Sequence, residues 1–199
     1  MSVGESPMPF PEARDHIVGM QTQNLYRAKE VMDRYDAQKI RLKSAGIDPI
    51  TNIIVNELFW MPKDTPLNTS SQDILNNQLK YADERPFANT DDIVITKNTF
   101  PYFIENSESL CVWVKFPLPP DPASEVGDIS DEHKALIEKY IQSTFVEWLG
   151  VPRENIAWFK NWAALQSIKS LAHVHVILNG ADEATINKAL GTGGVAIEY

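Results

Sequence analysis

The 199-residue chain contains a single cysteine, Cys111, so it has no partner for an internal disulfide. This cysteine lies in the apolar run SLCVWVKF, where a small core side chain is expected rather than a reactive thiol. Long hydrophobic segments are also missing, since no apolar run approaches the ~20 residues of a membrane-spanning helix. The N-terminus MSVGESPMPFPEARD lacks the basic and apolar regions of a signal peptide. A soluble cytoplasmic protein is therefore expected.

Basic residues are fewer than acidic ones, and the formal net charge is −9. This balance argues against nucleic acid or an anionic membrane as a partner and leaves a small-molecule substrate, with a homodimer as a possible assembly. The chain has no P-loop, no G-x-G-x-x-G, no G-x-S-x-G and no pair of cysteines spaced for zinc. The glycine string GTGGV at 191–195 is expected to be flexible. Neither a cofactor nor a metal is expected.

The first half of the chain is rich in helix formers, within what we interpret as one domain over residues 1–199. Residues 1–11 hold several prolines and are expected to form a loose arm, followed by a helical segment over 12–60. Within that segment, Asp48 and Pro49 form a cap and first position for a helix. Residues 61–90 are polar and proline-containing, which indicates a long surface loop with one short helix. We call this segment the 61–90 excursion.

The second half changes to β-branched and aromatic runs. Four runs are expected to form strands of one mainly antiparallel sheet: 92–97, 109–116, 155–161 and 170–178. Ser130 is a good N-cap for a long amphipathic helix over 130–149, and a last helix is expected to end at Gly191. Strands around one long helix, with further helices at the N-terminus, indicate an α+β fold.

Two of the four histidines stand two residues apart in the run KSLAHVHVILNG. On a strand, His173 and His175 share one face roughly 6.6 Å apart, while Val174 and Val176 face the other way. Three interpretations are open: structural polar residues on a half-exposed strand, a metal site, or acid–base and nucleophilic chemistry. The metal site is disfavoured because no carboxylate follows the pair closely and Glu183 is too far along the chain.

Several segments resemble the fungal N-acetylglucosamine-induced protein family, a domain of unknown function. They are PITNIIVNELFW, KNTFPY, LCVWVKFPLPPDP, GDISDEHKALIEKYIQSTF and ENIAWFKNWAALQSIKSLAHVHVIL. The last of these is the most specific, and the resemblance covers about residues 49–190. The N-terminal 45 residues look unlike the family, and Ala172 and Thr99 stand where that family usually has acidic residues. No settled reaction follows from this resemblance.

A more distant resemblance connects residues 92–190 with the histidine triad superfamily, in its galactose-1-phosphate uridylyltransferase branch. The elements that carry it are the turn Asn98–Pro101, Lys115 at a strand end, the helix after Ser130, the strand Phe159–Asn161 and the motif Ser170–His175. The resemblance implies that His175 is the nucleophile and His173 its partner. The third histidine or glutamine of the superfamily is Ile177 here. Residues expected to bind the substrate are Asn98, Lys160, Asn161, Trp162, Gln166, Ser167 and Ser170.

Three functions are consistent with these patterns. The first is a cofactor-independent enzyme that transfers or hydrolyses a phosphoester or nucleotidyl group on a small molecule. The second is a lyase, isomerase or cyclase that uses the histidine pair to shuttle protons on a small metabolite in fungal specialised metabolism. The third is a non-catalytic binding or regulatory protein that keeps the fold.

Overall fold

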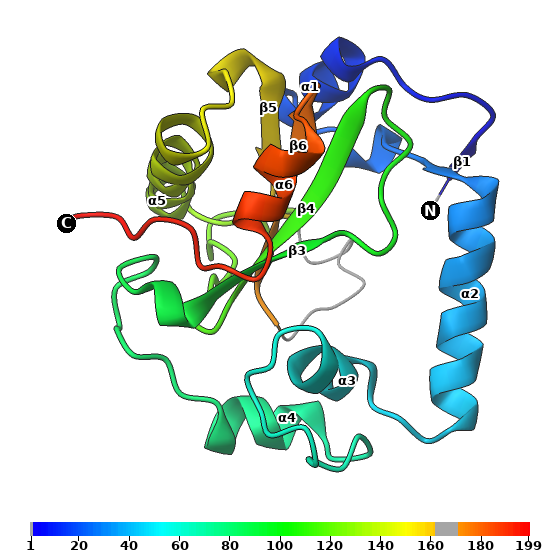
Figure 1. The fold of residues 1–199 in the computed structure, drawn as a ribbon, viewed down its shortest axis with the longest axis vertical. Helices are drawn as coiled ribbons and strands as arrows, with labels where there is room; N and C mark the ends of the chain where they lie inside the picture. The colour runs from blue at the N-terminus through cyan, green and yellow to red at the C-terminus, as the bar shows by residue number, and fades with distance from the viewer. Residues whose placement is uncertain (1, 162–170) are drawn as a thin grey trace.

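A four-stranded antiparallel sheet forms the centre of the molecule. The computed structural model describes residues 2–161 and 171–199, and within them the strand order is β3-β4-β6-β5. Figure 1 places this sheet between α5 on one side and α2 on the other, with α3 and α4 at the bottom of the view. The architecture is the α+β fold expected from the sequence. The strands are β3 Ile93–Lys97, β4 Ser107–Val114, β5 Ile156–Phe159 and β6 His173–Asn179.

One face of the sheet carries the larger hydrophobic core. Every second residue of the strands contributes to it, as the two-residue period of a strand requires. Helix α5, Asp131–Ile141, packs on this face and continues as the π-helical stretch η4, Gln142–Trp148. The cap predicted for this helix is present, because Ser130 accepts a hydrogen bond from the backbone N–H of His133. Helix α6, Glu183–Ala189, closes the same core beside the C-terminal residues.

The opposite face of the sheet is covered by the N-terminal half of the chain. Helix α1, Phe10–Val18, packs over β5 and β6. Helix α3, Pro49–Asn56, packs over β3 and β4. The short helices α4, Ser71–Asp73, and η2, Ile74–Gln78, lie beside α3 in the same group. Each of the two groups forms its own hydrophobic cluster. The stretch of sheet between the clusters carries the two histidines.

Residues 2–11 do not form the loose arm expected from their prolines. The short strand β1, Val3–Gly4, pairs in parallel with β2, Arg27–Ala28. Met8 is buried, and its backbone N–H donates to the Phe103 carbonyl at 2.8 Å. Backbone pairing and burial of an apolar side chain order this segment, which local composition alone does not reveal.

The helical segment expected over 12–60 is interrupted. Helix α1 ends at Val18, and Met20 takes a positive φ of 55° in the turn that follows. A 3₁₀ turn, η1 Thr22–Asn24, leads into the extended residues of β2, and α2 spans Lys29–Ser44. The backbone of residues 26–28 is extended because Tyr26 and Arg27 make hydrogen bonds to Phe103 and Ser2.

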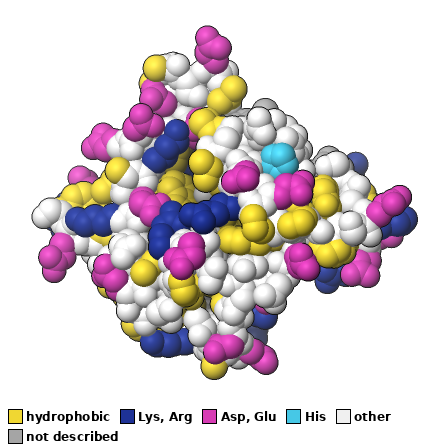
Figure 2. Space-filling model, turned by 90° about the horizontal axis from the view of Figure 1, so that it is seen from above, with side chains coloured by type: hydrophobic (Ala, Val, Ile, Leu, Met, Phe, Trp, Pro, Cys, Tyr) yellow, Lys and Arg dark blue, Asp and Glu magenta, His cyan; other side chains and the backbone are white. Residues whose placement is uncertain are grey.

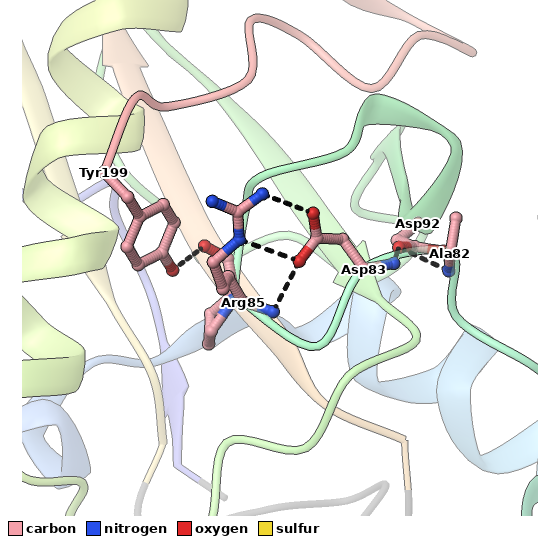
Figure 3. Close-up of polar contacts among 6 residues, drawn as sticks. Ala82, Asp83, Arg85, Asp92 and Tyr199 are labelled. Carbon is pink, nitrogen blue, oxygen red and sulfur yellow. Dashed lines mark hydrogen bonds and ion pairs between the residues drawn. The ribbon is translucent and has the colours of Figure 1, made fainter.

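The 61–90 excursion includes the short helix expected within it and is anchored to the body by buried side chains and by hydrogen bonds. Ile74 and Phe87 are completely buried. The buried carboxylate of Asp92 accepts hydrogen bonds from the backbone N–H groups of Ala82 and Asp83 (Figure 3). In the same view Arg85 pairs with Asp83, and the hydroxyl of Tyr199 reaches the backbone beside Arg85, which ties the C-terminal segment to the excursion.

Within the described residues, no helix has the length and apolar character needed to cross a membrane.

Candidate functional site

The two histidines lie side by side on the sheet face between the N-terminal clusters. Their ring centroids are 5.1 Å apart, and they are 7% and 6% exposed. Val174 and Val176 point into the opposite core, as the alternation of the strand predicts. The expectation that His173 and His175 share one face is confirmed.

Aromatic rings pack against both imidazoles. In the strand register, Trp113 stands opposite His173 and Phe159 stands opposite His175. The Trp113 and His173 ring centroids are 4.5 Å apart, and Phe159 stacks on His175 at 4.9 Å with an interplanar angle of 20°. Tyr102, from the β3–β4 loop, meets His175 edge-on at 6.0 Å. These contacts hold the two imidazoles in fixed orientations.

A hydrogen bond selects the tautomer of His173. Its Nδ1 lies 3.0 Å from the Leu171 carbonyl oxygen, which can only accept, so Nδ1 carries the proton. In the neutral ring, Nε2 therefore keeps its lone pair. For His175, Nδ1 lies 3.8 Å from the sulfur of Cys111.

Burial keeps both imidazoles uncharged. It lowers the pKa of His173, which the ammonium of Lys160 lowers further. Burial also lowers the pKa of His175 well below its usual value, with additional contributions from His173 and Arg27. Burial raises the pKa of Cys111 to about 12, so its side chain is a thiol at neutral pH. The cysteine is a core residue, as the sequence indicated, and the imidazoles are the basic groups here.

A cavity of about 230 Å³ opens over the histidine pair. We call it the histidine cavity. Helix α2, one side of α3 and the β3–β4 loop form its walls, and β4 and β6 form its floor. Its charged lining residues are Arg27, Lys39, Glu57 and Lys97, and Lys97 also lies 3.6 Å from Glu108.

Two functional candidates in this cavity were not found from the sequence. Arg27 donates to the Phe100 carbonyl at 2.8 Å, and its guanidinium lies 4.6 Å from the centre of the Tyr102 ring. Glu57, just after α3, has its pKa raised by burial. Both come from the N-terminal half of the chain, where no residue spacing marks them as site residues, although Glu57 lies in the segment PITNIIVNELFW. They reach the histidines only because this half folds over the sheet.

Comparison with known proteins identifies the family. A family model described as "Protein of unknown function (DUF3605)" matches residues 9–179. The chain belongs to this family. The match begins at Pro9, the residue before α1, so the expectation that the N-terminal 45 residues lie outside the family resemblance is wrong.

Two curated fungal relatives are similar to this DUF3605 chain. N-acetylglucosamine-induced protein 1 of Candida albicans is 32% identical over 191 residues, covering 94% of this chain and 74% of the relative. The uncharacterized protein YPL067C of Saccharomyces cerevisiae is 27% identical over 158 residues, covering 77% and 70%. The first of these relatives bears the name of the fungal family that the sequence resembles.

The crystal structure of HTC1 shares the fold of this DUF3605 chain. Its TM-score is 0.72 at 22% sequence identity, and the similarity covers 96% of this chain and 99% of that one. The similarity therefore extends over both the sheet and the N-terminal helices, and it is a similarity of fold.

The structure brings two of the predicted substrate-binding residues to the histidine cavity. The side-chain oxygen of Asn98 accepts from the Phe100 backbone N–H at 3.1 Å, and its amide donates to Ser109 at 3.2 Å. Asn161 is 7% exposed and donates to the Tyr102 hydroxyl at 3.4 Å. Lys160 is not in the lining of the histidine cavity, and it lines two other cavities instead. The predicted residues Trp162, Gln166, Ser167 and Ser170 lie outside the described residues.

The third position of the histidine motif belongs to the core. Ile177 is 1% exposed and packs in the hydrophobic cluster of α1. Two imidazoles, rather than three, therefore face the cavity from β6. Among residues 2–161 and 171–199, no three His, Cys, Asp or Glu side chains are grouped closely enough to hold a metal ion.

Proposed function

We propose that this chain is a cofactor-independent enzyme that transfers or hydrolyses a phosphoester or nucleotidyl group on a small molecule. The observation that carries the proposal is the pair of neutral, oriented imidazoles lining the histidine cavity. A neutral imidazole can attack phosphorus or accept a proton at neutral pH, whereas a protonated one can do neither. The resemblance of the Ser170–His175 motif to the histidine triad superfamily supports the same chemistry.

In the proposed reaction His175 is the nucleophile. The reaction uses the tautomer in which Nδ1, which lies 3.8 Å from the sulfur of Cys111, carries the proton, and the lone pair of Nε2 attacks the phosphorus atom. A P–N bond forms, the bond to the leaving oxygen breaks with its electron pair, and the carboxyl of Glu57 gives this oxygen a proton. Water then attacks the phosphorus, the P–N bond breaks with its electron pair returning to His175, and Nε2 of His173 takes the proton of the water. That proton passes through solvent to the Glu57 carboxylate, which restores both groups for the next turnover.

Charge supports an anionic substrate. The chain as a whole has a net charge of −9, yet the histidine cavity is lined by three cationic side chains, Arg27, Lys39 and Lys97, and one carboxyl, Glu57. Burial raises the pKa of Glu57, which makes ionisation of this one carboxyl less favourable, and the cationic side chains of the lining outnumber it. A phosphate group of a substrate is attracted to such a lining.

The experiment is a turnover screen in which ³¹P NMR follows nucleotide sugars, sugar 1-phosphates and nucleoside monophosphate esters. The wild type should convert at least one class, His175→Ala should not, and His16→Ala should behave as wild type because His16 lies on α1 and does not line the cavity. Equal turnover by His175→Ala and wild type would refute the proposal.

A second candidate is a proton-shuttling lyase, isomerase or cyclase acting on a small metabolite, and Glu57 favours it. A carboxyl with a raised pKa in one cavity with two neutral imidazoles forms an acid–base set that needs no phosphorus. Incubation in D₂O distinguishes the two candidates, since a proton shuttle exchanges a carbon-bound hydrogen of its substrate and phosphoryl transfer does not. In the non-catalytic alternative, ligands bind but neither turnover nor exchange occurs.

A further inference from the structure

A second cavity adjoins the histidine pair. It has a volume of about 470 Å³ and shares His173 and Asn161 with the histidine cavity. Its walls come from η2 and the residues after it, the end of β4 with the prolines that follow, and the start of β6. We call it the lysine cavity, after Lys115 and Lys160 in its lining.

The lysine cavity is positively charged in a chain that is strongly acidic overall. Among the described residues that line it, Lys115 and Lys160 are the charged side chains and none is acidic. The net charge of the whole chain is −9. Two like charges at one partly enclosed cavity repel each other, and this arrangement is stabilised by an anion that binds there.

Lys160 forms no hydrogen bond or ion pair with any residue in the described part of the chain. It is partly buried, which lowers the pKa of its ammonium, although Asp128 acts in the opposite direction from a distance. Asp128 itself pairs with Lys134 at 2.8 Å. Lys160 and His173 line the same cavity, and the positive charge of Lys160 lowers the pKa of His173. A partly buried ammonium that has no counter-ion favours the binding of an anion beside it.

Lys115 is held in position by a long ion pair with Asp92. Its side chain is 16% exposed, and its ammonium lies 3.8 Å from Asp92 and 5.5 Å from the centre of the Trp60 ring. The Asp92 carboxylate already accepts hydrogen bonds from the backbone of Ala82 and Asp83 (Figure 3). A distance of 3.8 Å is too long for a hydrogen bond, so the donors of Lys115 remain available to a ligand.

We infer that the lysine cavity binds an anionic group of the substrate, a phosphate or a group of like charge, between Lys115 and Lys160. The inference rests on the proposed function in taking the histidine pair as the reacting centre. His173 and Asn161 line both cavities, so the reacting bond lies at the junction. The substrate class is then a two-part metabolite, with its reacting group over His175 and a second, anionic group in the lysine cavity.

The test uses inorganic phosphate, pyrophosphate and citrate as probes, with affinity measured by calorimetry. Because a charge-assisted hydrogen bond is lost, Lys160→Met and Lys115→Met should each weaken binding of pyrophosphate by roughly 10–100-fold. Lys160→Arg should keep most of the affinity. The matched control is Lys63→Met, which removes an exposed lysine that lines none of these cavities and should bind as wild type does. A preference for pyrophosphate over citrate would identify phosphate, and the reverse a carboxylate.

Two results would overturn the inference. The first is equal affinity for pyrophosphate in Lys160→Met and Lys63→Met. The second is loss of pyrophosphate binding in His175→Ala, because His175 does not line the lysine cavity. Thermal melting checks that each variant is folded. If a lysine variant does not fold, the pKa of Lys160 in the wild type tests the inference instead. NMR should show that pKa rising when pyrophosphate binds. Lysine-dependent binding without turnover of any phosphoester would support the anion site while refuting the proposed reaction.

Discussion

Each histidine of the pair has a different set of contacts, and this difference predicts separate roles. His173 is tied through Nδ1 to the Leu171 carbonyl and is the residue shared with the lysine cavity. His175 is tied only weakly, to a sulfur atom, and is stacked on Phe159 at 4.9 Å. We therefore expect His175 to react and His173 to orient the substrate or transfer a proton.

Alanine substitutions test this division of roles. With a substrate from the turnover screen, His175→Ala should lose essentially all activity, because the nucleophile is gone. His173→Ala should lose ~10²–10⁴-fold in kcat, the usual cost of one acid–base partner. Circular dichroism should show both variants folded. Small and equal losses in the two variants would instead indicate that the pair only binds.

The lowered pKa of His175 also predicts how stability depends on pH. The unfolded chain binds a proton at His175 below the ordinary value of 6.5, whereas the folded chain does so only at much lower pH. The unfolded state therefore holds more protons in this window, and the free energy of unfolding falls as the pH drops below about 6.5, by up to ~1.4 kcal/mol per pH unit for one histidine.

Urea denaturation of wild type and His175→Asn at pH 5, 6, 7 and 8 measures this effect. The wild type should lose stability between pH 7 and 5 more steeply than the variant, since the remaining titratable groups are common to both. Parallel curves for the two proteins would show that His175 is not titrating between these states.

At the scale of elements, α3 forms the wall of the histidine cavity that carries Ile53 and ends beside Glu57. Its start is fixed by Asp48, which accepts from the backbone N–H groups of Ile50 and Thr51 at 2.9 and 3.0 Å. The second carboxylate oxygen accepts from the hydroxyl of Ser71 at 3.0 Å. One side chain therefore caps the helix and joins it to α4.

Asp48→Ala should lower the free energy of unfolding by about 1–2 kcal/mol, the upper range for an N-cap, because the contacts to Ser71 are lost with it. Asp48→Asn keeps one acceptor oxygen and should cost less. Guanidinium denaturation measures both changes. A destabilisation in Asp48→Asn as large as in Asp48→Ala would mean that the charge, not the cap, matters.

The elements with a strong local pattern could be predicted from the sequence. The alternation of side chains in β6 predicted that His173 and His175 share one face, and the N-cap at Ser130 predicted the start of α5. Asp48 and Pro49 gave the start of α3 in the same way. In each case the residues that decide the structure are neighbours in the chain.

The elements that depend on distant partners could not be predicted. The strand pair β1–β2 and the break between α1 and α2 are set by hydrogen bonds between residues 2 and 27 and between 26 and 103. Arg27 and Glu57 reach the histidines through the same tertiary packing. Glu57 lies in the segment PITNIIVNELFW that resembles the fungal family, but no residue spacing in the sequence marks it or Arg27 as part of the site.

At the scale of the whole molecule, the two faces of the sheet serve different purposes. One face is a continuous apolar core under α5 and α6. The other face is split into two hydrophobic clusters, and the polar side chains of the site occupy the gap. The surface seen in Figure 2 has lysine and arginine gathered near its centre with acidic side chains around them, so neither sign of charge covers that face.

Phe87 joins parts of the chain that are far apart in sequence, and its loss should affect the whole fold. Its ring, completely buried, lies 4.9 Å from the Phe116 ring and stacks on Tyr140 at 4.8 Å. Its carbonyl accepts from the Ile197 backbone N–H at 3.0 Å. The residue thus connects the 61–90 excursion with the end of the sheet, with α5 and with the C-terminal segment.

Phe59 offers a matched control for Phe87, because both residues have a positive φ, 55° and 64°, but Phe59 is 74% exposed. Alanine keeps the Cβ atom, so the backbone strain is nearly unchanged in both variants and only the burial of the ring differs. Phe87→Ala should lower the free energy of unfolding by about 3–5 kcal/mol, and Phe59→Ala should change it by less than about 0.5 kcal/mol. Urea denaturation followed by tryptophan fluorescence measures both. A loss below about 1 kcal/mol in Phe87→Ala would mean that the excursion and the C-terminal segment do not depend on this ring for their attachment to the core.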